Sequence, residues 1–153
     1  KDMEIYCSKR VGDELKTRFA YAFAEDKYPG APSFELHEIT GNFELFDAKV
    51  IPVEVMHYQL PIFGFKLKKV AYITDASFIS ETEKEKLKNL DYLSLNCIRK
   101  EHFHPAHFIL PQVLELFEEL QPKKMYLTHI VKAGFQTVNN NSNRVTVYFD
   151  NPF

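Results

Sequence analysis

The chain has 153 residues, 45% of them hydrophobic and 14% aromatic, which is enough for one domain with a sizeable core and too little for two. Its formal net charge of −2 excludes an overall positive field of the kind that gathers nucleic acid or an anionic membrane surface. We therefore expect one domain over residues 1–153, with nucleic acid as a partner only through a local basic patch.

The first predicted elements are a strand, a helix and a hairpin. Residues 4–7 form a strand-like apolar run, and residues 35–39 and 43–46, on either side of Thr40-Gly41-Asn42, predict a hairpin. Between them lies an apolar stripe at four-residue intervals, which predicts an amphipathic helix: Val11, Leu15, Phe19 and Phe23.

The middle of the chain predicts a strand that is buried on one face and a second hairpin. Alternating apolar residues over 51–55 indicate a strand, and Pro52 places it toward a sheet edge or at the start of a ladder. Residues 64–67 and 70–74 predict the hairpin. Ser80 and Glu83 predict a capping box at the start of a helix that runs to about Leu90.

The last third predicts an alternation of strands and one helix. Strands are expected over 92–97, 125–127 and 145–149, and an amphipathic helix between Pro111 and Pro122. Strand, helix, strand, helix, strand over residues 70–128 is the pattern of the α/β class.

Both cysteines, Cys7 and Cys97, lie within strand-like apolar runs, which indicates buried free thiols rather than a disulfide. No apolar stretch reaches the roughly 18 residues that a membrane span needs, and the start of the chain has no apolar signal region. These observations predict a cytoplasmic location. The chain begins without methionine and enters a strand at once, so we expect it to be part of something longer.

Three strand-like runs each lead to a residue that can bind a metal: His57, Asp75 and His129. Any one of them alone is more simply a turn cap, but neighbouring strands bring their ends together, so two imidazoles and a carboxylate can converge on one ion. The facial triad of an iron oxygenase is the rival arrangement, although its first histidine and carboxylate usually lie two residues apart, and here they are 18 apart.

Residues 101–108 hold three of the six histidines, His102, His104 and His107. This segment is a solvated loop, a short metal-binding tract, or the source of a general acid, since imidazole titrates near neutral pH. In the last case His107 is the candidate, with His104 second.

Several segments taken in order resemble the metallo-β-lactamase-fold hydrolases, in particular the bacterial branch with the phosphoribosyl cyclic phosphodiesterase, and more distantly ribonuclease Z. They cover nearly the whole chain: residues 18–23, 28–30, 55–58 with 64–65, 72–76, 95–101, 104–108 and 126–130.

The resemblance implies the C-terminal part of an αββα sandwich. It also implies that His57 is a ligand of one metal, Asp75 a carboxylate bridging two metals, His129 a ligand of the second, and His107 an acid beside them. The implied chemistry is phosphodiester hydrolysis by a metal-bound hydroxide at two divalent ions, zinc or manganese.

The family's HxHxDH motif, which supplies the other ligands, is absent. We therefore expect a C-terminal portion that is inactive alone and whose partners are the missing N-terminal half of the fold and a small phosphodiester or similar ester; a homodimer stays open. Two alternatives remain: a non-catalytic binding or assembly module on a degenerate scaffold, and a thioester or lactone hydrolase.

Overall fold

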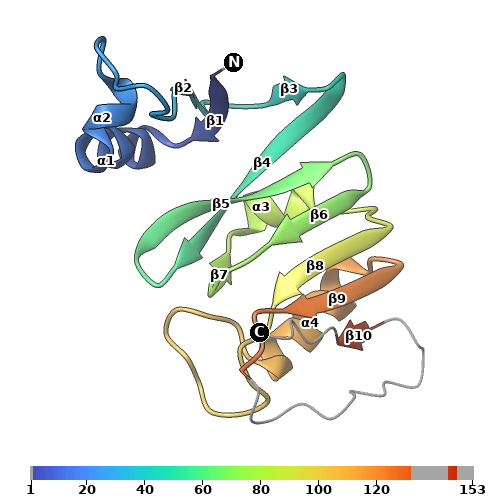
Figure 1. Cartoon of the computed structure of the whole chain (residues 1–153). Coiled ribbons are helices and arrows are strands. Elements are labelled where there is room, and N and C mark those ends of the chain that lie inside the picture. Colours follow the sequence, from blue (N-terminus) through green and yellow to red (C-terminus); the bar gives the residue numbers. More distant parts are fainter. Residues whose placement is uncertain (1, 132–144, 148–153) are drawn as a thin grey trace. The chain divides into compact units, whose positions relative to one another are not determined.

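A computed structural model describes residues 2–131 and 145–147. The chain divides into two compact units, residues 1–43 and 44–153, and each is described by itself. Figure 1 labels the helices and strands of both units.

The first unit is a parallel strand pair with two helices between its strands. Its elements are β1 (Met3–Cys7), α1 (Lys9–Arg18), α2 (Ala20–Phe23) and β2 (Phe34–Glu38). The single helix predicted here is interrupted at Phe19, which has φ −117° and ψ 40°. The predicted apolar stripe is not the buried face, because Val11 and Phe19 are exposed and Gly12 is the buried residue of α1.

The hairpin predicted over residues 35–46 is wrong. β2 pairs with β1 in parallel, from Met3 opposite Phe34 to Cys7 opposite Glu38. β3 (Phe43–Leu45) instead lies next to β4 in the other sheet. A parallel pair needs a crossover of about a dozen residues or more, which α1 and α2 supply. A turn-like sequence at 40–42 fixes the chain's local bend but not the partner of the strand before it.

The second unit is built on a mixed sheet with the strand order β10-β9-β8-β6-β5-β4-β3, and β7 pairs with β4. Its strands are β4 (Ala48–His57), β5 (Leu60–Leu67), β6 (Val70–Ile73), β7 (Phe78–Ile79), β8 (Tyr92–Asn96), β9 (Lys124–Thr128) and β10 (Val145–Val147). The predicted hairpin of β5 and β6 is confirmed. Of the two positions that Pro52 predicted for β4, the sheet edge is wrong, because β3 lies outside β4. Of the last predicted strand, residues 148–149 lie outside the described residues.

Two helices, α3 (Glu81–Lys86) and α4 (Leu110–Leu120), cover one face of this sheet (Figure 1). Lys84 of α3 and Glu119 of α4 form an ion pair of 2.8 Å between them. Among the described residues, no helix has both the length and the apolar composition that a membrane crossing requires.

The start of α3 corrects one prediction. The Ser80 hydroxyl accepts the Glu83 N–H at 3.3 Å, as a capping box requires. The Glu83 carboxylate does not return to Ser80 but accepts the backbone N–H of Glu54 at 2.9 Å. The Glu83 carboxylate therefore binds a donor distant in the sequence, and the second hydrogen bond of the capping box is not formed. The helix α3 also ends at Lys86, short of the predicted Leu90.

The core lies between the sheet and the two helices. Its fully buried members include residues of the three parallel strands, of α4 and of the turn before β8: Ile73, Leu93, Leu95, Leu127, Val113, Leu87 and Leu90. Burying each such side chain contributes about 1.5–3 kcal/mol. The α/β class is confirmed. The parallel pairing of β6 with β8 and of β8 with β9 brings the carboxyl ends of these strands to one edge.

Candidate metal centre

Three strand ends deliver the predicted ligands. His57 is the last residue of β4, Asp75 follows β6 by two residues, and His129 directly follows β9. Leu95 of β8 is opposite Ile73 on one side and Leu127 on the other. Because these strands are in register, the residues that follow them emerge at the same level of the sheet.

The Asp75 carboxylate is the point on which the histidines converge. Its Oδ1 lies 3.2 Å from His107 Nε2 and 3.5 Å from His129 Nε2. The His107 and His129 rings are stacked with centroids 4.8 Å apart. The structure therefore places the predicted acid and one predicted ligand on the same oxygen of the predicted bridging carboxylate.

His57 approaches the same residue from the other side. Its Nδ1 lies 2.8 Å from the Asp75 carbonyl oxygen. A carbonyl only accepts, so the proton is on Nδ1 and the Nε2 lone pair is left for a metal. The His57 ring lies 4.8 Å from the His107 ring. All four residues predicted from the sequence are thus brought together.

Both Asp75 and His129 have a positive φ, 57° and 55°, and so does Tyr58 at 56°. Left-handed backbone in a non-glycine residue is uncommon and persists where surrounding contacts hold it. Ser77 supplies one such contact, since its hydroxyl donates to Met56 O at 3.0 Å and accepts the Tyr58 N–H at 3.1 Å. The repeated threonine before Asp75 and His129 marks this shared turn in the sequence.

The loop after β8 holds His107 against the cluster. Arg99 donates to the carbonyls of His102 and Phe103 at 2.9 and 3.0 Å, so its guanidinium folds the loop. His107 is 9% exposed, and the solvated-loop prediction does not apply to it.

His104 defines the protonation of His107. Its Nδ1 accepts the Ala106 N–H at 3.2 Å and lies 3.1 Å from His107 Nδ1. An Nδ1 that accepts from Ala106 carries no proton, so the proton between the rings belongs to His107 Nδ1. Neutral His107 then presents an Nε2 lone pair to the centre, and protonated His107 presents an N–H to Asp75.

Burial lowers the pKa of His107, and its hydrogen bond to Asp75 opposes that shift in part. Burial also lowers the pKa of His104, and the nearby Arg99 charge adds to the effect. With both pKa values below the ordinary value for histidine, the neutral forms dominate at neutral pH, and neutral imidazole is the form that binds metals.

These residues fit a divalent metal ion. The ligand atoms of His57, Asp75 and His107 all lie within 4.8 Å of one another. Two ligands of one zinc ion, each about 2.1 Å from it, can be at most about 4.2 Å apart, so a small side-chain movement closes the group on an ion. Two nitrogens and a carboxylate suit several transition metals, and the set leaves the identity of the metal open.

A shallow groove of about 450 Å³ begins at His57. Its lining is mostly apolar and comes from the β4–β5 turn and the histidine loop: Tyr58, Gln59, Leu60, Pro105 and Ala106. Tyr58 is 60% exposed although its φ is positive. The positive φ is the one that the two-residue turn between His57 and Leu60 uses to join β4 to β5.

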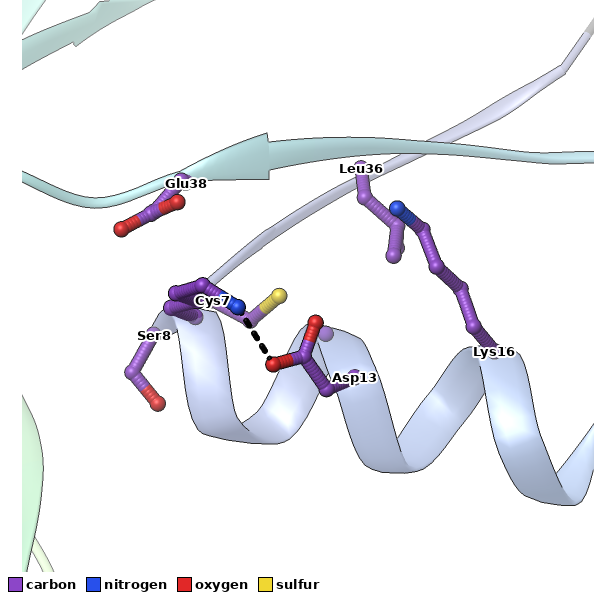
Figure 2. Close-up of a pocket in the computed structure, with 8 residues that line it drawn as sticks. Cys7, Ser8, Asp13, Lys16, Leu36 and Glu38 are labelled. Carbon is purple, nitrogen blue, oxygen red and sulfur yellow. Dashed lines mark hydrogen bonds and ion pairs between the residues drawn. The ribbon is translucent and has the colours of Figure 1, made fainter.

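The first unit contains a separate pocket of about 270 Å³ (Figure 2). Its charged side chains are already paired or spread apart: Asp13 forms the marked 2.6 Å ion pair with Lys9, and Lys16 and Glu38 lie on opposite sides of the view. The pocket gathers no second metal ligand group, and it is not the site predicted from the sequence.

The sequence did not predict the residues that support the ligands through hydrogen bonds. These are Asn96, Ser77 and, in its contact with His107, His104. Asn96 stands in an apolar strand run, where an amide is out of place unless it is hydrogen-bonded. That mismatch is the signal that could have found it.

Comparison with known proteins identifies the family of the chain. Residues 1–130 match the family described as the β-lactamase superfamily domain. A diphosphatase from the PhnP family is 34% identical, with a TM-score of 0.75 over 85% of this chain and 48% of the diphosphatase. The short form of human tRNase Z shares the fold at 15% identity, with a TM-score of 0.66 over 97% of this chain and 66% of that one.

An octanoyltransferase of Porphyromonas gingivalis is 30% identical over 132 residues, which are 85% of this chain and 27% of that protein. The chain therefore spans about half the length of the diphosphatase and about a quarter of the octanoyltransferase. The matched region holds the strand ends and all the clustered histidines, and the chain belongs to the β-lactamase superfamily.

Proposed function

We propose that these residues form the C-terminal part of a hydrolase that cleaves a small phosphodiester at two divalent metal ions, zinc or manganese. The observation that carries the proposal is the convergence of His107 and His129 on one oxygen of Asp75. The 34% identity to a diphosphatase from the PhnP family supports phosphoester chemistry over the other reactions of the fold.

In this proposal His57, Asp75 and His129 would hold the metals, with Asp75 contributing to both. His107, whose ligand atom groups with those of His57 and Asp75, would be kept as the acid. The ions supply water activation and neutralise charge on the phosphoryl oxygens. The protonated form of His107 carries a proton on Nε2 as well as on Nδ1, and in this form Nε2 donates its proton to the departing oxygen while His104 orients the ring at Nδ1. Asp75 Oδ1 holds that N–H until the substrate displaces it.

Because the chain spans 48% of the diphosphatase, we propose that the remaining ligands come from outside these 153 residues. The chain alone should then bind metal but show negligible turnover of bis(p-nitrophenyl) phosphate with added Zn²⁺ or Mn²⁺. A turnover near that of an intact relative would contradict this. The two buried free thiols support a reducing compartment such as the cytoplasm.

The metal site is tested by calorimetric titration of the chain with Zn²⁺. Asp75→Asn keeps the shape of the side chain but removes the charge, and we expect it to weaken binding at least about 100-fold, beyond the loss from changing an outer-layer contact. The matched control is Asp13→Asn, which removes a carboxylate from the pocket of the first unit. Equal affinity of Asp75→Asn and the unaltered chain would refute the site.

A second candidate function is hydrolysis of an acyl ester or thioester at the same centre. It is favoured by the mostly apolar groove that starts at His57, and by the name of the octanoyltransferase relative. The longer protein that contains this chain decides between the two: we expect it to hydrolyse bis(p-nitrophenyl) phosphate faster than p-nitrophenyl octanoate, and the opposite order would favour the acyl substrate. No turnover of either would favour a non-catalytic module.

A further inference from the structure

The turn after β6 contains Ala76, which is fully buried. Its N–H donates to Asn96 Oδ1 at 2.8 Å. Its carbonyl oxygen accepts two hydrogen bonds, from Asn96 Nδ2 at 2.9 Å and from the backbone N–H of Phe108 at 2.8 Å. Every hydrogen-bonding group of Ala76 is therefore used.

Asn96 is the last residue of β8 and is fully buried. A buried side-chain amide costs free energy unless its donors and acceptor are bonded. Both ends of this amide are bonded to the same residue, Ala76, which fixes the orientation of the peptide groups on either side of it. The amide is thus a two-point clamp on the turn.

The clamp acts on both residues of the Asp75–His107 contact. Asp75 directly precedes Ala76 and has the positive φ that needs outside support. His107 directly precedes Phe108, whose backbone N–H donates a hydrogen bond to the same Ala76 carbonyl oxygen. The positions of Asp75 Oδ1 and His107 Nε2, 3.2 Å apart, are therefore linked through Ala76, whose two flanking peptide groups Asn96 holds.

We propose that Asn96 is a positioning residue that sets the Asp75 carboxylate and the His107 imidazole at their working distance. It touches neither side chain and acts through Ala76. The catalytic meaning of this assignment rests on the proposed function, whereas the clamp itself does not.

Thr128 provides a matched control. It is opposite Asn96 in the β8–β9 register and precedes His129. Its buried Oγ1 has no hydrogen-bond partner among the described residues. Thr128→Val therefore changes the neighbouring position on the next strand without removing a contact to the turn.

The clamp is tested first without metal, by amide hydrogen exchange followed by NMR. In the unaltered chain we expect the Ala76 amide, which is not in a strand, to exchange as slowly as the amides of β8. Asn96→Ala should speed exchange at Ala76 and Phe108 at least about tenfold more than at β9, and Thr128→Val should not. Fast exchange at Ala76 in the unaltered chain overturns the proposal even if Asn96→Ala fails to fold.

The second measurement is Zn²⁺ affinity, which separates positioning from general stability. Asn96→Ala should weaken Zn²⁺ binding about 10–100-fold, the range for residues that orient metal ligands through hydrogen bonds. Val113→Ala removes buried volume from α4 without removing a hydrogen bond to the turn, and should lower the melting temperature without changing the affinity. Unchanged affinity in Asn96→Ala, or an equal loss in Val113→Ala, would reject positioning.

The two measurements separate failure of this inference from failure of the proposed function. If the unaltered chain binds no Zn²⁺ while Ala76 is protected and loses protection in Asn96→Ala, the proposed metal site fails and the clamp stands. If Zn²⁺ binds and Ala76 exchanges fast, the metal site stands and the clamp fails.

Discussion

The two units of the chain start from the same local plan and differ in what they can bury. Each contains parallel strands joined through helices: β1 with β2 in the first, and β6, β8 and β9 in the second. The first has a sheet of two strands and few buried residues, Cys7, Gly12, Ala22 and Ile39. The second has an eight-stranded sheet and one continuous apolar cluster.

The amount of buried surface in each unit determines where reactive side chains can be held in place. In the first unit the Lys9–Asp13 ion pair is exposed, and an exposed pair of this kind adds little to stability and fixes little. In the second, strand ends anchored by the core hold Asp75 and the histidines, and a buried amide holds the turn between them. Precise placement of reactive groups needs such a rigid support.

The largest expected contrast between the units is in thiol reactivity. Burial raises the pKa of Cys97 to about 12 from the ordinary 9.0, three units, so at pH 8 it has about 1000-fold less thiolate than a free cysteine. Burial also raises the pKa of Cys7, which is 9% exposed. We expect 4,4′-dithiodipyridine to label Cys7 in the variant Cys97→Ser well before Cys97 in Cys7→Ser.

The pH dependence of Cys97 has a definite sign. The pKa of Cys97 is higher in the folded state than in the unfolded state. The contribution of this thiol to stability is therefore fully present below pH 9, and it is lost as the pH rises toward about 12. Unfolding in urea at pH 7, 9 and 10 should show the loss, and Cys97→Ser should lack it. Labelling of both thiols at one rate in the native protein would contradict the difference in burial.

The second contrast is in tolerance of one methyl group. A Cβ on Gly64 would lie 2.6 Å from Ile73 Cγ1 and 3.0 Å from the Tyr72 carbonyl oxygen, where β5 meets β6. Gly64→Ala should therefore lower the free energy of unfolding by about 1–3 kcal/mol. A Cβ on Gly41 would meet nothing within 4 Å, and Gly41→Ala should change it by less than about 0.5 kcal/mol. Urea denaturation of the two variants measures both, and equal values would show that the β5–β6 contact yields without cost.

The sequence predicted the second unit better than the first for a physical reason. β8, α4 and β9 are each bounded by local signals, such as Pro111 in the first turn of α4, and each buries a face that its own pattern marks. The ligands followed because parallel strands end at one edge. β2 could not be predicted in the same way, since its partner lies beyond two helices and stacking of Tyr6 on His37 and Phe43 is a contact between distant residues.

What the sequence left out of the site lies mostly in the backbone. The positive φ of Asp75 and His129 depends on hydrogen bonds from other elements, and Asn96 holds a main-chain group rather than a side chain. Patterns of residue type report side chains, so contacts to backbone groups leave little trace in them. Glu83 is the same case, because the backbone N–H that it binds belongs to Glu54, on a strand that comes earlier in the chain.

The smallest expected contrast concerns the two serine-capped helices. Ser80 caps α3 and Ser8 caps α1, with similar long hydrogen bonds of 3.3 and 3.4 Å. The turn after α3 buries Leu87 and Leu90 completely, whereas α1 buries only Gly12. Loss of the cap at Ser80 therefore disturbs a helix that is tied to the core, and Ser80→Ala should lower the free energy of unfolding by about 1 kcal/mol.

Ser8→Ala serves as the comparison and should cost less than about 0.5 kcal/mol in the same urea titration, because α1 can fray without exposing a large apolar surface. Its effect should instead be seen as faster amide exchange at Val11, which donates to the Ser8 hydroxyl. If the two serine variants lowered the free energy of unfolding equally, the first unit would be as strongly coupled to cooperative unfolding as the second, and the contrast in buried surface would not determine how much a cap contributes.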